Sequence, residues 1–360
     1  MARIGIACGG TGGHLFPGLA LAEEFERLGH HVRLYISEKP VDAEVMKSYP
    51  QFESVSLPVI GWAGMIHSPF FLLRFILAYR QCLGEMKVFE PHAMIGMGGF
   101  LSAPPLLAAL KQSIPAYLHE SNSIPGRVTR WFAPRMTRVF LGFEECARHL
   151  PSAPVLATGT PVRQSLKKMS KESAAKMLSV ETGKTLVVMG GSQGARSLNT
   201  LVLQAAPLLG HDWKKWQVIH LAGMNDVERV ENAYRELDIK AKVLPFCDEM
   251  EAVYSLADLV VARSGAASLS EIAHYALPSL LVPYPNAVDD HQAKNAEIFM
   301  WRSAARCLDE RIASAKQFAR ELHSLMQDEA ARRRMTEQVK SVFPEDTTSR
   351  IVKEVSYAFA

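Results

Sequence analysis

Three glycine-rich segments stand where short apolar runs give way to helical patterns. They are residues 8–14 (CGGTGGH), 97–102 (MGGFLS) and 189–195 (MGGSQGA). Glycine lets the backbone approach a phosphate without an intervening Cβ atom, and a helix start carries free N–H groups and a partial positive charge. These segments have neither the dinucleotide spacing G-x-G-x-x-G nor the triphosphatase spacing G-x-x-x-x-G-K-[ST]. Together they indicate a site for a phosphate or sugar-phosphate ligand.

A histidine directly follows the first glycine segment. An imidazole at the start of a helix can take a proton from a hydroxyl nucleophile near neutral pH, which makes His14 the candidate catalytic residue. From the residues alone an alternative stays open, in which His14 only caps the helix or packs against its neighbours.

Residues 263–271 (RSGAASLSE) form a further strand-to-helix turn. Here Ser268 is predicted to reach a phosphate, and Glu271, one turn later, to accept both hydroxyls of a ribose. The spacing of these two residues fits a helix capping box equally well, so a purely structural role stays open for both.

A polar cluster follows at residues 289–295 (DDHQAKN), where amides and carboxylates are suited to recognising sugar hydroxyls. A metal site at Asp289, Asp290 and His291 is disfavoured, because adjacent acidic side chains point apart and the chain has no D-x-D pair. We therefore expect neither a metal ion nor another cofactor.

Length and composition exclude several classes of protein. A chain of 360 residues predicts two domains, and 48% hydrophobic with 21% charged residues describes an ordinary globular protein. A net charge of +3 is too small to indicate a nucleic-acid partner. The five cysteines form no C-x-x-C pair and indicate reduced thiols in the cytosol, and the first residues do not resemble an export signal.

The elements that must position these residues follow a regular alternation. Short β-rich runs alternate with helical patterns, which predicts a doubly wound α/β fold with parallel sheets. The predicted strands are 3–7, 32–36, 93–95, 116–119, 138–141, 186–189, 218–221, 242–244, 259–262 and 279–282. A boundary near Pro161 divides the chain into domains 1–161 and 162–344, with a last helix at about 345–360 packing back on the first. Parallel sheets bind ligands beyond the carboxyl ends of their strands, so the active site is expected in a cleft between the domains.

The most apolar stretch is residues 70–79 (FFLLRFILAY), which is too short to cross a bilayer and is interrupted by Arg74. One interpretation is a buried amphipathic helix. The other is a helix on a membrane surface, with Arg74 and Arg80 at lipid headgroups. Three apolar residues just before it, Trp62, Met65 and Ile66, slightly favour the membrane surface.

With these residues in hand, the sequence resembles the MurG family along essentially its whole length. The resemblance rests on residues 9–18, 98–100, 119–122, 159–163, 190–194, 263–271 and 289–292. This family has the two-domain GT-B fold, in which two Rossmann-like domains face each other across a cleft. It transfers N-acetylglucosamine from UDP to an undecaprenyl-linked muramyl-pentapeptide at the cytoplasmic face of the membrane.

The resemblance implies roles for particular residues. The C-terminal domain is expected to bind UDP-N-acetylglucosamine, and the N-terminal domain the lipid-linked acceptor. His14 is expected to act as base or to position the acceptor. Residues implied to bind the donor are Thr11, Gly12, Gly13, Asn122, Arg163, Ser192, Phe246, Cys247, Ala266, Ala267, Ser268, Leu269, Ser270, Glu271 and Gln292. Phe70, Phe71 and Phe75 are implied to contact the membrane, which favours peripheral attachment.

The implied reaction is an inverting displacement, in which the C4 hydroxyl of the acceptor attacks C1 of the donor sugar and UDP leaves. The chain departs from the family where Ser121 replaces the usual Gln and Thr160 the usual Asn. Three rivals remain: a GT-B transferase with another acceptor, a UDP-sugar epimerase and an accessory subunit without catalysis. Residues 119–122 argue against a transferase with another acceptor. An epimerase would release UDP without needing a lipid acceptor. The presence of both halves of the two-domain fold argues against an accessory subunit.

Overall fold

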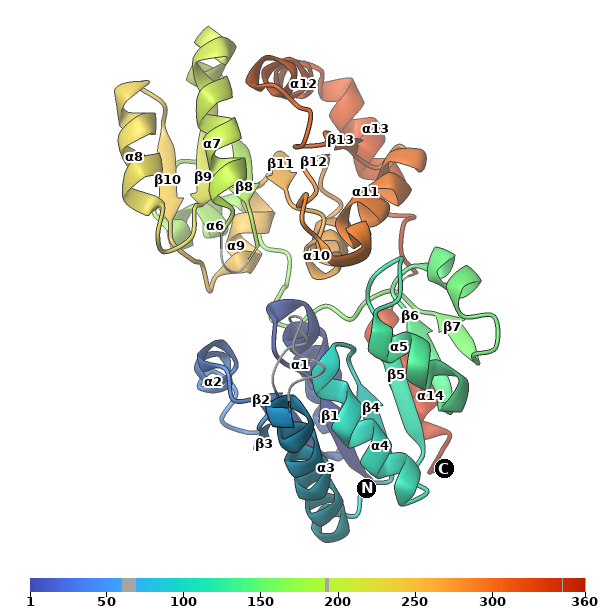
Figure 1. The fold of residues 1–360 in the computed structure, drawn as a ribbon. Helices are drawn as coiled ribbons and strands as arrows, with labels where there is room; N and C mark the ends of the chain where they lie inside the picture. The colour runs from blue at the N-terminus through green and yellow to red at the C-terminus, as the bar shows by residue number, and fades with distance from the viewer. Residues whose placement is uncertain (60–68, 192–193, 345, 360) are drawn as a thin grey trace. The chain divides into compact units, whose positions relative to one another are not determined.

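The chain folds into two compact units. The computed structural model describes residues 1–59, 69–191, 194–344 and 346–359. The first unit comprises Met1–Gln164 and Phe343–Ala360, and the second comprises Ser165–Val342 (Figure 1). The chain therefore passes into the second unit after Gln164 and returns to the first unit at Phe343, before its last helix.

The first unit is built on a seven-stranded sheet in which every pair of neighbouring strands is parallel. The strand order is β3-β2-β1-β4-β5-β6-β7. The strands are β1 (Arg3–Ala7), β2 (His31–Ser37), β3 (Glu53–Leu57), β4 (Ala93–Gly96), β5 (Ala116–Glu120), β6 (Arg138–Leu141) and β7 (Val155–Ala157).

Helices cover both faces of this sheet (Figure 1). On one face, α1 and the C-terminal α14 pack against Ile4 and Ile6, and on the other α3, α4 and α5 pack against Ala7 and Met94. The alternation follows from the pleat, which turns successive side chains to opposite faces. The helices are α1 (Gly12–Arg27), α2 (Pro40–Met46), α3 (Pro69–Phe89), α4 (Ala103–Lys111), α5 (Arg127–Phe132) and α14 (Thr347–Ser356), with short 3-10 helices η1 (Phe100–Ser102), η2 (Ala133–Arg135) and η3 (Glu144–His149).

The second unit repeats the plan with six parallel strands in the order β10-β9-β8-β11-β12-β13. Its strands are β8 (Lys184–Met189), β9 (Trp216–Leu221), β10 (Ala241–Leu244), β11 (Leu259–Ala262), β12 (Ser279–Leu281) and β13 (Arg306–Cys307). Its helices are α6 (Lys171–Leu178), α7 (Arg196–Ala205), α8 (Val227–Glu236), α9 (Met250–Leu256), α10 (Ala266–Tyr275), α11 (His291–Trp301), α12 (Ala315–Gln327) and α13 (Glu329–Val339), with 3-10 helices η4 (Ala206–Lys215) and η5 (Val288–Asp290). One face packs Leu186 and Val188 against α7, α8 and α12.

Both sheets share one topology, which places the glycine segments. In each, the first strand lies in the middle, the next two extend to one side, and the chain then returns to build the other side. This confirms the predicted doubly wound α/β fold, in which ligands bind beyond the carboxyl ends of the strands where the winding reverses. The reversal lies between β1 and β4 in the first unit and between β8 and β11 in the second.

Candidate active site

The reversal point of the first unit brings the first two glycine segments together. β1 and β4 pair in parallel with Ala7 opposite Gly96, so the segments that follow both strands lie at the same edge. The backbone of Gly98 and Gly99 has φ values of 88° and 67°, which favour glycine. A Cβ atom on either residue would lie 3.2 Å from an atom of the His14 ring. The second segment is therefore the surface on which the His14 imidazole rests.

The His14 imidazole is oriented by the residue at the N-cap of α1. Thr11 has extended backbone geometry there, and its Oγ1 lies 3.0 Å from Nδ1 of His14. This contact holds the ring plane at the helix start, beside the free N–H groups of the first turn. Gly12 and Gly13 form that turn, so the residues expected around the reacting centre in this unit, Thr11 to His14, are contiguous in space as well as in sequence.

A buried carboxylate that the motifs did not point to fixes the first glycine segment. Oδ2 of Asp42, on α2, accepts hydrogen bonds from the Gly10 N–H at 2.6 Å and from the N–H and hydroxyl of Ser37 at 3.1 and 2.5 Å. Lys39 donates to the Gly10 carbonyl at 2.7 Å. The short α2 thus anchors both polar backbone groups of Gly10. A buried Asp in the sequence SEKPVDAE has no distinctive spacing, so sequence analysis missed it.

Glu120, at the end of β5, organises the loop that presents Asn122. Its Oε1 accepts from the N–H of Asn122 at 3.0 Å and from the side-chain amide of Asn122 at 3.2 Å. Its Oε2 accepts from the Gly126 N–H at 2.9 Å and from the Thr129 hydroxyl at 2.6 Å. With four donors on one buried carboxylate, Glu120 is a structural residue of this loop, and Asn122 is the side chain that it positions.

His119 is fully buried, and its role differs from that of His14. Nε2 donates to the Gly159 carbonyl at 3.1 Å, and Nδ1 lies 3.3 Å from the Ser121 hydroxyl. Burial lowers the pKa of His119 to about 4, so the ring is neutral near pH 7. His119 therefore ties the end of β5 to the segment leading out of the first unit. Ser121 is one of the two positions at which the sequence departs from the family that it resembles. Its hydroxyl is the partner of the His119 ring at Nδ1.

The burial of His119 makes the stability of the first unit sensitive to acid. Its pKa is about 4 in the folded protein against an ordinary value of 6.5, so between these values the unfolded chain binds a proton that the folded protein does not. We expect the free energy of unfolding to fall as pH falls through this range, by up to about 1.4 kcal/mol per pH unit. Chemical denaturation at pH 7, 6 and 5 measures this slope. The variant His119→Asn, which keeps an amide donor but does not titrate, should show a shallower slope, and equal slopes would contradict the assignment.

Arg163, expected to bind the nucleotide, belongs to the first unit. Its guanidinium lies over the Phe16 ring on α1, 4.1 Å from the ring centroid. The adjacent Gln164 donates from its backbone N–H to Glu23 and from its side chain to Glu24, both on α1. The residues just before the chain enters the second unit are thus held against α1.

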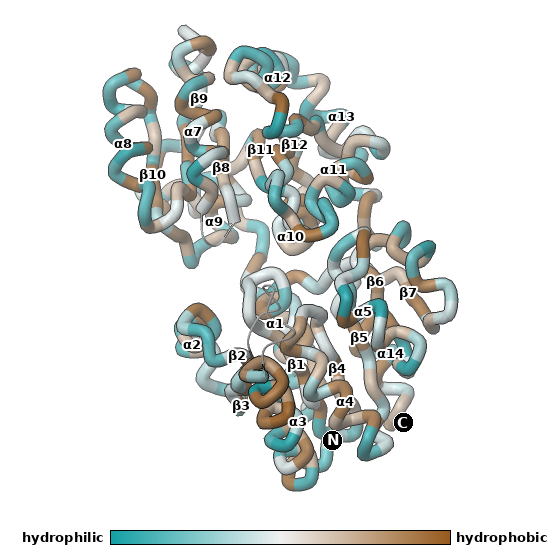
Figure 2. Tube along the Cα trace, viewed as in Figure 1, coloured by the Kyte–Doolittle hydropathy of each residue, from teal (hydrophilic) through white to brown (hydrophobic). Residues whose placement is uncertain are grey.

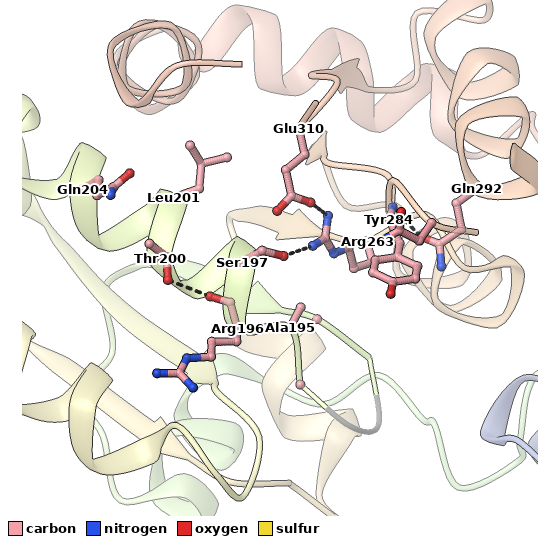
Figure 3. A pocket seen from close by; sticks show the side chains of 13 residues that line it. Ala195, Arg196, Ser197, Thr200, Leu201, Gln204, Arg263, Tyr284, Gln292 and Glu310 are labelled. Atoms are coloured by element: carbon pink, nitrogen blue, oxygen red, sulfur yellow. Dashed lines mark hydrogen bonds and ion pairs between the residues drawn. The ribbon is translucent and has the colours of Figure 1, made fainter. Parts of the chain in front are cut away.

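In the second unit, the reversal point between β8 and β11 opens into a cavity of about 990 Å³ (Figure 3). The third glycine segment supplies one wall through Gly190, Gly194 and Ala195, and Arg263 and Gln292 supply another. Ser192 lies outside the described residues. The described lining includes Gln292 but not Phe246, Cys247 or Glu271, so the residues assigned to the donor do not all share this cavity.

Arg263 is the charged centre of the cavity wall. It is only 4% exposed, and its Nη1 forms an ion pair with Glu310 and donates to the carbonyls of Val282 and Pro283 at 2.9 and 3.0 Å. Its Nη2 donates to the Ser197 hydroxyl, at the start of α7, at 2.9 Å (Figure 3). Arg263 therefore fastens the loops after β11 and β12 to the helix that follows the third glycine segment.

The start of α10 tests the capping-box interpretation of Ser268 and Glu271. The N-cap residue is Gly265, so Ser268 lies within the first helical turn and the capping-box interpretation is wrong. Among the described residues no side chain caps this helix. The N–H groups of its first turn, in Ala266, Ala267 and Ser268, have no acceptor four residues earlier within the helix. Glu271, one turn on, accepts a hydrogen bond from the Tyr254 hydroxyl at 2.7 Å.

The remaining residues expected to bind the donor differ in how far their side chains are exposed to solvent. Leu269 is fully buried, and the Ser270 hydroxyl donates to the Ala266 carbonyl at 3.0 Å, so both side chains serve the fold. Phe246 is exposed, whereas Cys247 is buried. Gln292 accepts from the Tyr284 N–H at 3.0 Å.

The cluster at residues 289–295 is occupied by local contacts. The His291 ring lies 2.6 Å from the Val288 carbonyl, and Asp290 pairs with Arg311 at 3.6 Å. In the part of the chain that the structure describes, no group of three or more His, Cys, Asp or Glu side chains is arranged to hold a metal ion.

The helix α3 carries an exposed apolar face, formed by Phe70, Leu72, Leu73, Ile76 and Leu77. Figure 2 shows much of this helix as hydrophobic. One prediction needs correction: Phe71 is 8% exposed and packs against Phe100, with ring centroids 4.9 Å apart, so it belongs to the core. Phe75 is half-buried against the same ring.

Two further predictions concern the surroundings of this face. Arg74 pairs with Glu38 at 3.1 Å, and its guanidinium lies 5.0 Å from the centroid of the Phe70 ring. Trp62, Met65 and Ile66 lie outside the described residues. Within the described ranges, no helix is long and apolar enough to span a bilayer.

Comparison with known proteins agrees with this architecture. The family models "Glycosyltransferase family 28 N-terminal domain" and "Glycosyltransferase family 28 C-terminal domain" match residues 4–141 and 185–351. The crystal structure of MurG from Acinetobacter baumannii has a TM-score of 0.77 at 22% identity and matches over 99% of both chains. A putative UDP-N-acetylglucosamine 2-epimerase from Listeria monocytogenes has a TM-score of 0.70 at 10% identity over 99% of this chain and 96% of its own. At this low identity, the comparison with the epimerase shows a similar fold and nothing more.

The chain has two doubly wound units, each with a glycine segment at its reversal point, and it matches both family 28 domains. Together these features define a glycosyltransferase of the GT-B class. The UDP-N-acetylglucosamine–N-acetylmuramyl-(pentapeptide) pyrophosphoryl-undecaprenol N-acetylglucosamine transferase of Geobacter metallireducens is 35% identical over 356 residues, which cover 98% of both chains. The chain belongs to this family of transferases, the MurG family, which confirms the resemblance.

Proposed function

We propose that this chain transfers N-acetylglucosamine from UDP-N-acetylglucosamine to the C4 hydroxyl of the N-acetylmuramyl-pentapeptide carried by pyrophosphoryl-undecaprenol. The observation that carries the proposal is the 35% identity to a transferase of that name across 98% of both chains. The glycine segments at both reversal points support it, because that is where a doubly wound sheet binds phosphate-bearing ligands.

The second unit is proposed to bind the donor. The uncapped start of α10 offers backbone N–H groups at Ala266, Ala267 and Ser268 to the diphosphate. Glu271 is proposed to accept the ribose hydroxyls, and Phe246 with the Cys247 backbone to contact the uracil. Gln292, in the cavity wall, is proposed to contact the donor sugar. Stabilising the diphosphate in this way favours its departure as UDP.

The first unit is proposed to bind the acceptor and to supply the base. Proton transfer from the attacking C4 hydroxyl to His14 would let that oxygen form the new bond to C1 as the bond from C1 to the diphosphate breaks. Attack opposite the leaving group inverts C1 and gives a β linkage. Thr11 orients the imidazole, and the glycine backbone at 98–99 leaves room for it.

The test is release of UDP from purified protein supplied with UDP-N-acetylglucosamine, with and without the lipid-linked muramyl-pentapeptide. We expect release that depends on the acceptor, together with a disaccharide product. Release without acceptor would favour an epimerase, and release only with a different acceptor would favour a related transferase.

We also propose that the apolar face of α3 rests on the membrane surface that holds the acceptor lipid. Phe70, Leu73 and Leu77 expose 52%, 54% and 48% of their surface along one helix. Such a contiguous face suits peripheral binding, because each apolar side chain contributes about 1–3 kcal/mol when it leaves water.

Replacing Leu73 and Leu77 together with Ser should lower binding to vesicles of mixed neutral and anionic phospholipid at least about tenfold, because two apolar contacts are lost. Co-sedimentation measures the binding, and UDP affinity should not change. The control is Leu208→Ser, which alters an equally exposed leucine in the second unit. Equal vesicle binding by all three proteins would contradict a membrane role for α3.

A further inference from the structure

A chain of buried polar side chains lies in the second unit beneath the third glycine segment. Asn199 on α7 and His220 on β9 are fully buried, and Asp226 and Tyr234 are almost fully buried. The cavity lining includes none of them. Burying a polar group in an apolar layer lowers the stability of the fold unless the group is hydrogen-bonded. A buried network of this size is therefore a candidate for a functional role.

In this network the donor and the acceptor of each hydrogen bond can be assigned. The Asn199 side-chain amide donates to the Ala222 carbonyl at 2.9 Å and to the Asp226 carboxylate at 2.7 Å. Its oxygen is therefore the acceptor for Nε2–H of His220, 3.0 Å away. Nδ1 of His220 then accepts from the Tyr234 hydroxyl at 2.9 Å. The Ala222 carbonyl and the Asp226 carboxylate thus orient the Asn199 amide, and His220 supplies a donor to its oxygen.

The Ala222 carbonyl is the point where this network meets the glycine segment. A Cβ atom on Gly194 would lie 2.5 Å from that oxygen and 2.7 Å from Cα of Gly223. The two backbones therefore touch directly, and Gly194 has a φ of 71° that favours glycine. Gly194 also donates from its N–H to the Gly191 carbonyl at 3.0 Å. The position of Ala222 consequently constrains Gly194, just before α7 begins.

The other end of the network reaches the cavity itself. Asp226 holds Arg229 through two hydrogen bonds of 2.7 Å, and Arg229 donates to the Thr200 hydroxyl at 3.2 Å. Thr200 in turn donates to the Arg196 carbonyl at 2.8 Å (Figure 3). Thr200 and Arg196 both line the cavity. The same network thus supports Gly194 and the first turns of α7.

We propose that His220 is a positioning residue for the donor site: through Asn199 and the Ala222 carbonyl, it holds Gly194 and the start of α7, in the cavity wall, in the arrangement that binds the diphosphate of a nucleoside diphosphate. The inference rests on the proposed function and deepens it, since it takes the diphosphate that the start of α10 receives to contact this cavity wall as well. His220 touches no substrate.

Three variants of the full chain test the proposal by UDP affinity from titration calorimetry and by the KM values for donor and acceptor. His220→Leu should weaken UDP binding and raise the donor KM, each about tenfold or more, because the Asn199 oxygen loses its donor. The acceptor KM should not change. His220→Gln, whose amide can still donate to Asn199, should stay within about threefold of wild type.

Thr185→Val is the control for stability, because Thr185 is fully buried at the opposite end of β8. It should lower the unfolding midpoint without changing UDP affinity. If His220→Leu does not fold, Asn199→Asp takes its place, since it keeps the acceptor for His220 but cannot donate to Ala222. The proposal fails if the folded variant binds UDP as wild type does, or if the Leu and Gln variants lose affinity equally. A wild-type protein that binds UDP but transfers no sugar would contradict the proposed function and leave this comparison valid.

Discussion

Replacing His14 with Ala is expected to lower kcat by about 10²–10⁴-fold, the range for losing a general base. The imidazole lies at the start of α1, oriented by Thr11 and seated on the Gly98–Gly99 backbone. Alanine keeps the helix and both glycine segments but leaves no group to take the proton of the attacking hydroxyl. UDP affinity should stay within about threefold, because the diphosphate is assigned to the second unit.

The measurement is acceptor-dependent UDP release under saturating substrates, with UDP affinity determined separately. His31→Ala is the matched control, since it removes a half-exposed histidine of the same unit that pairs with Glu53. If kcat for His14→Ala falls less than about tenfold, His14 is not the base and serves the acceptor only by position.

Replacing Arg263 with Leu is expected to lower the free energy of unfolding of the second unit by about 3–5 kcal/mol. The substitution leaves the Glu310 carboxylate, of which 12% is exposed, without its cation. It also removes the donors to the Val282 and Pro283 carbonyls and to Ser197. The loops on two sides of the cavity would lose their common partner, so UDP affinity should fall as well.

Hydrogen exchange of peptides from β8, β11 and β12 reports the stability of this unit within the full chain. The double variant Arg263→Leu with Glu310→Gln should recover part of the loss, because no charge is then left buried without a partner. Arg306→Leu is the control, since its pair with Glu321 is about one-third exposed and should contribute at most about 1 kcal/mol. Equal losses for Arg263→Leu and Arg306→Leu would mean that burial adds nothing to the Arg263 pair.

The sequence predicted the central strands of both sheets. Each of the ten predicted runs corresponds to a strand, and all but β10 are central strands, which are apolar on both faces in a parallel sheet and therefore appear as continuous apolar runs. The strands that were missed, β3, β7 and β13, lie at sheet edges. β3 has the sequence ESVSL and is mostly exposed, and β13 has two residues, so neither carries an apolar run.

The face of α3 shows what a sequence pattern leaves undecided. Phe70 and Phe71 are neighbours of the same type, yet one is half exposed and the other packs against Phe100. A helix that is apolar nearly all round has no polar face to mark its orientation, so hydrophobicity cannot say which side meets the core. The packing of α4 and η1 against α3 determines which side of the helix is buried.

By itself the sequence determined the fold class, the three glycine segments, the family and the position of His14, because glycines and buried strands leave local patterns. Only the tertiary structure decided what holds these parts. Asp42 anchors Gly10 across 32 positions of the chain, Arg263 joins Glu310 across 47, and the His14 ring rests on glycines from another strand. Contacts between residues far apart in sequence depend on how elements pack, and no spacing along the chain records them.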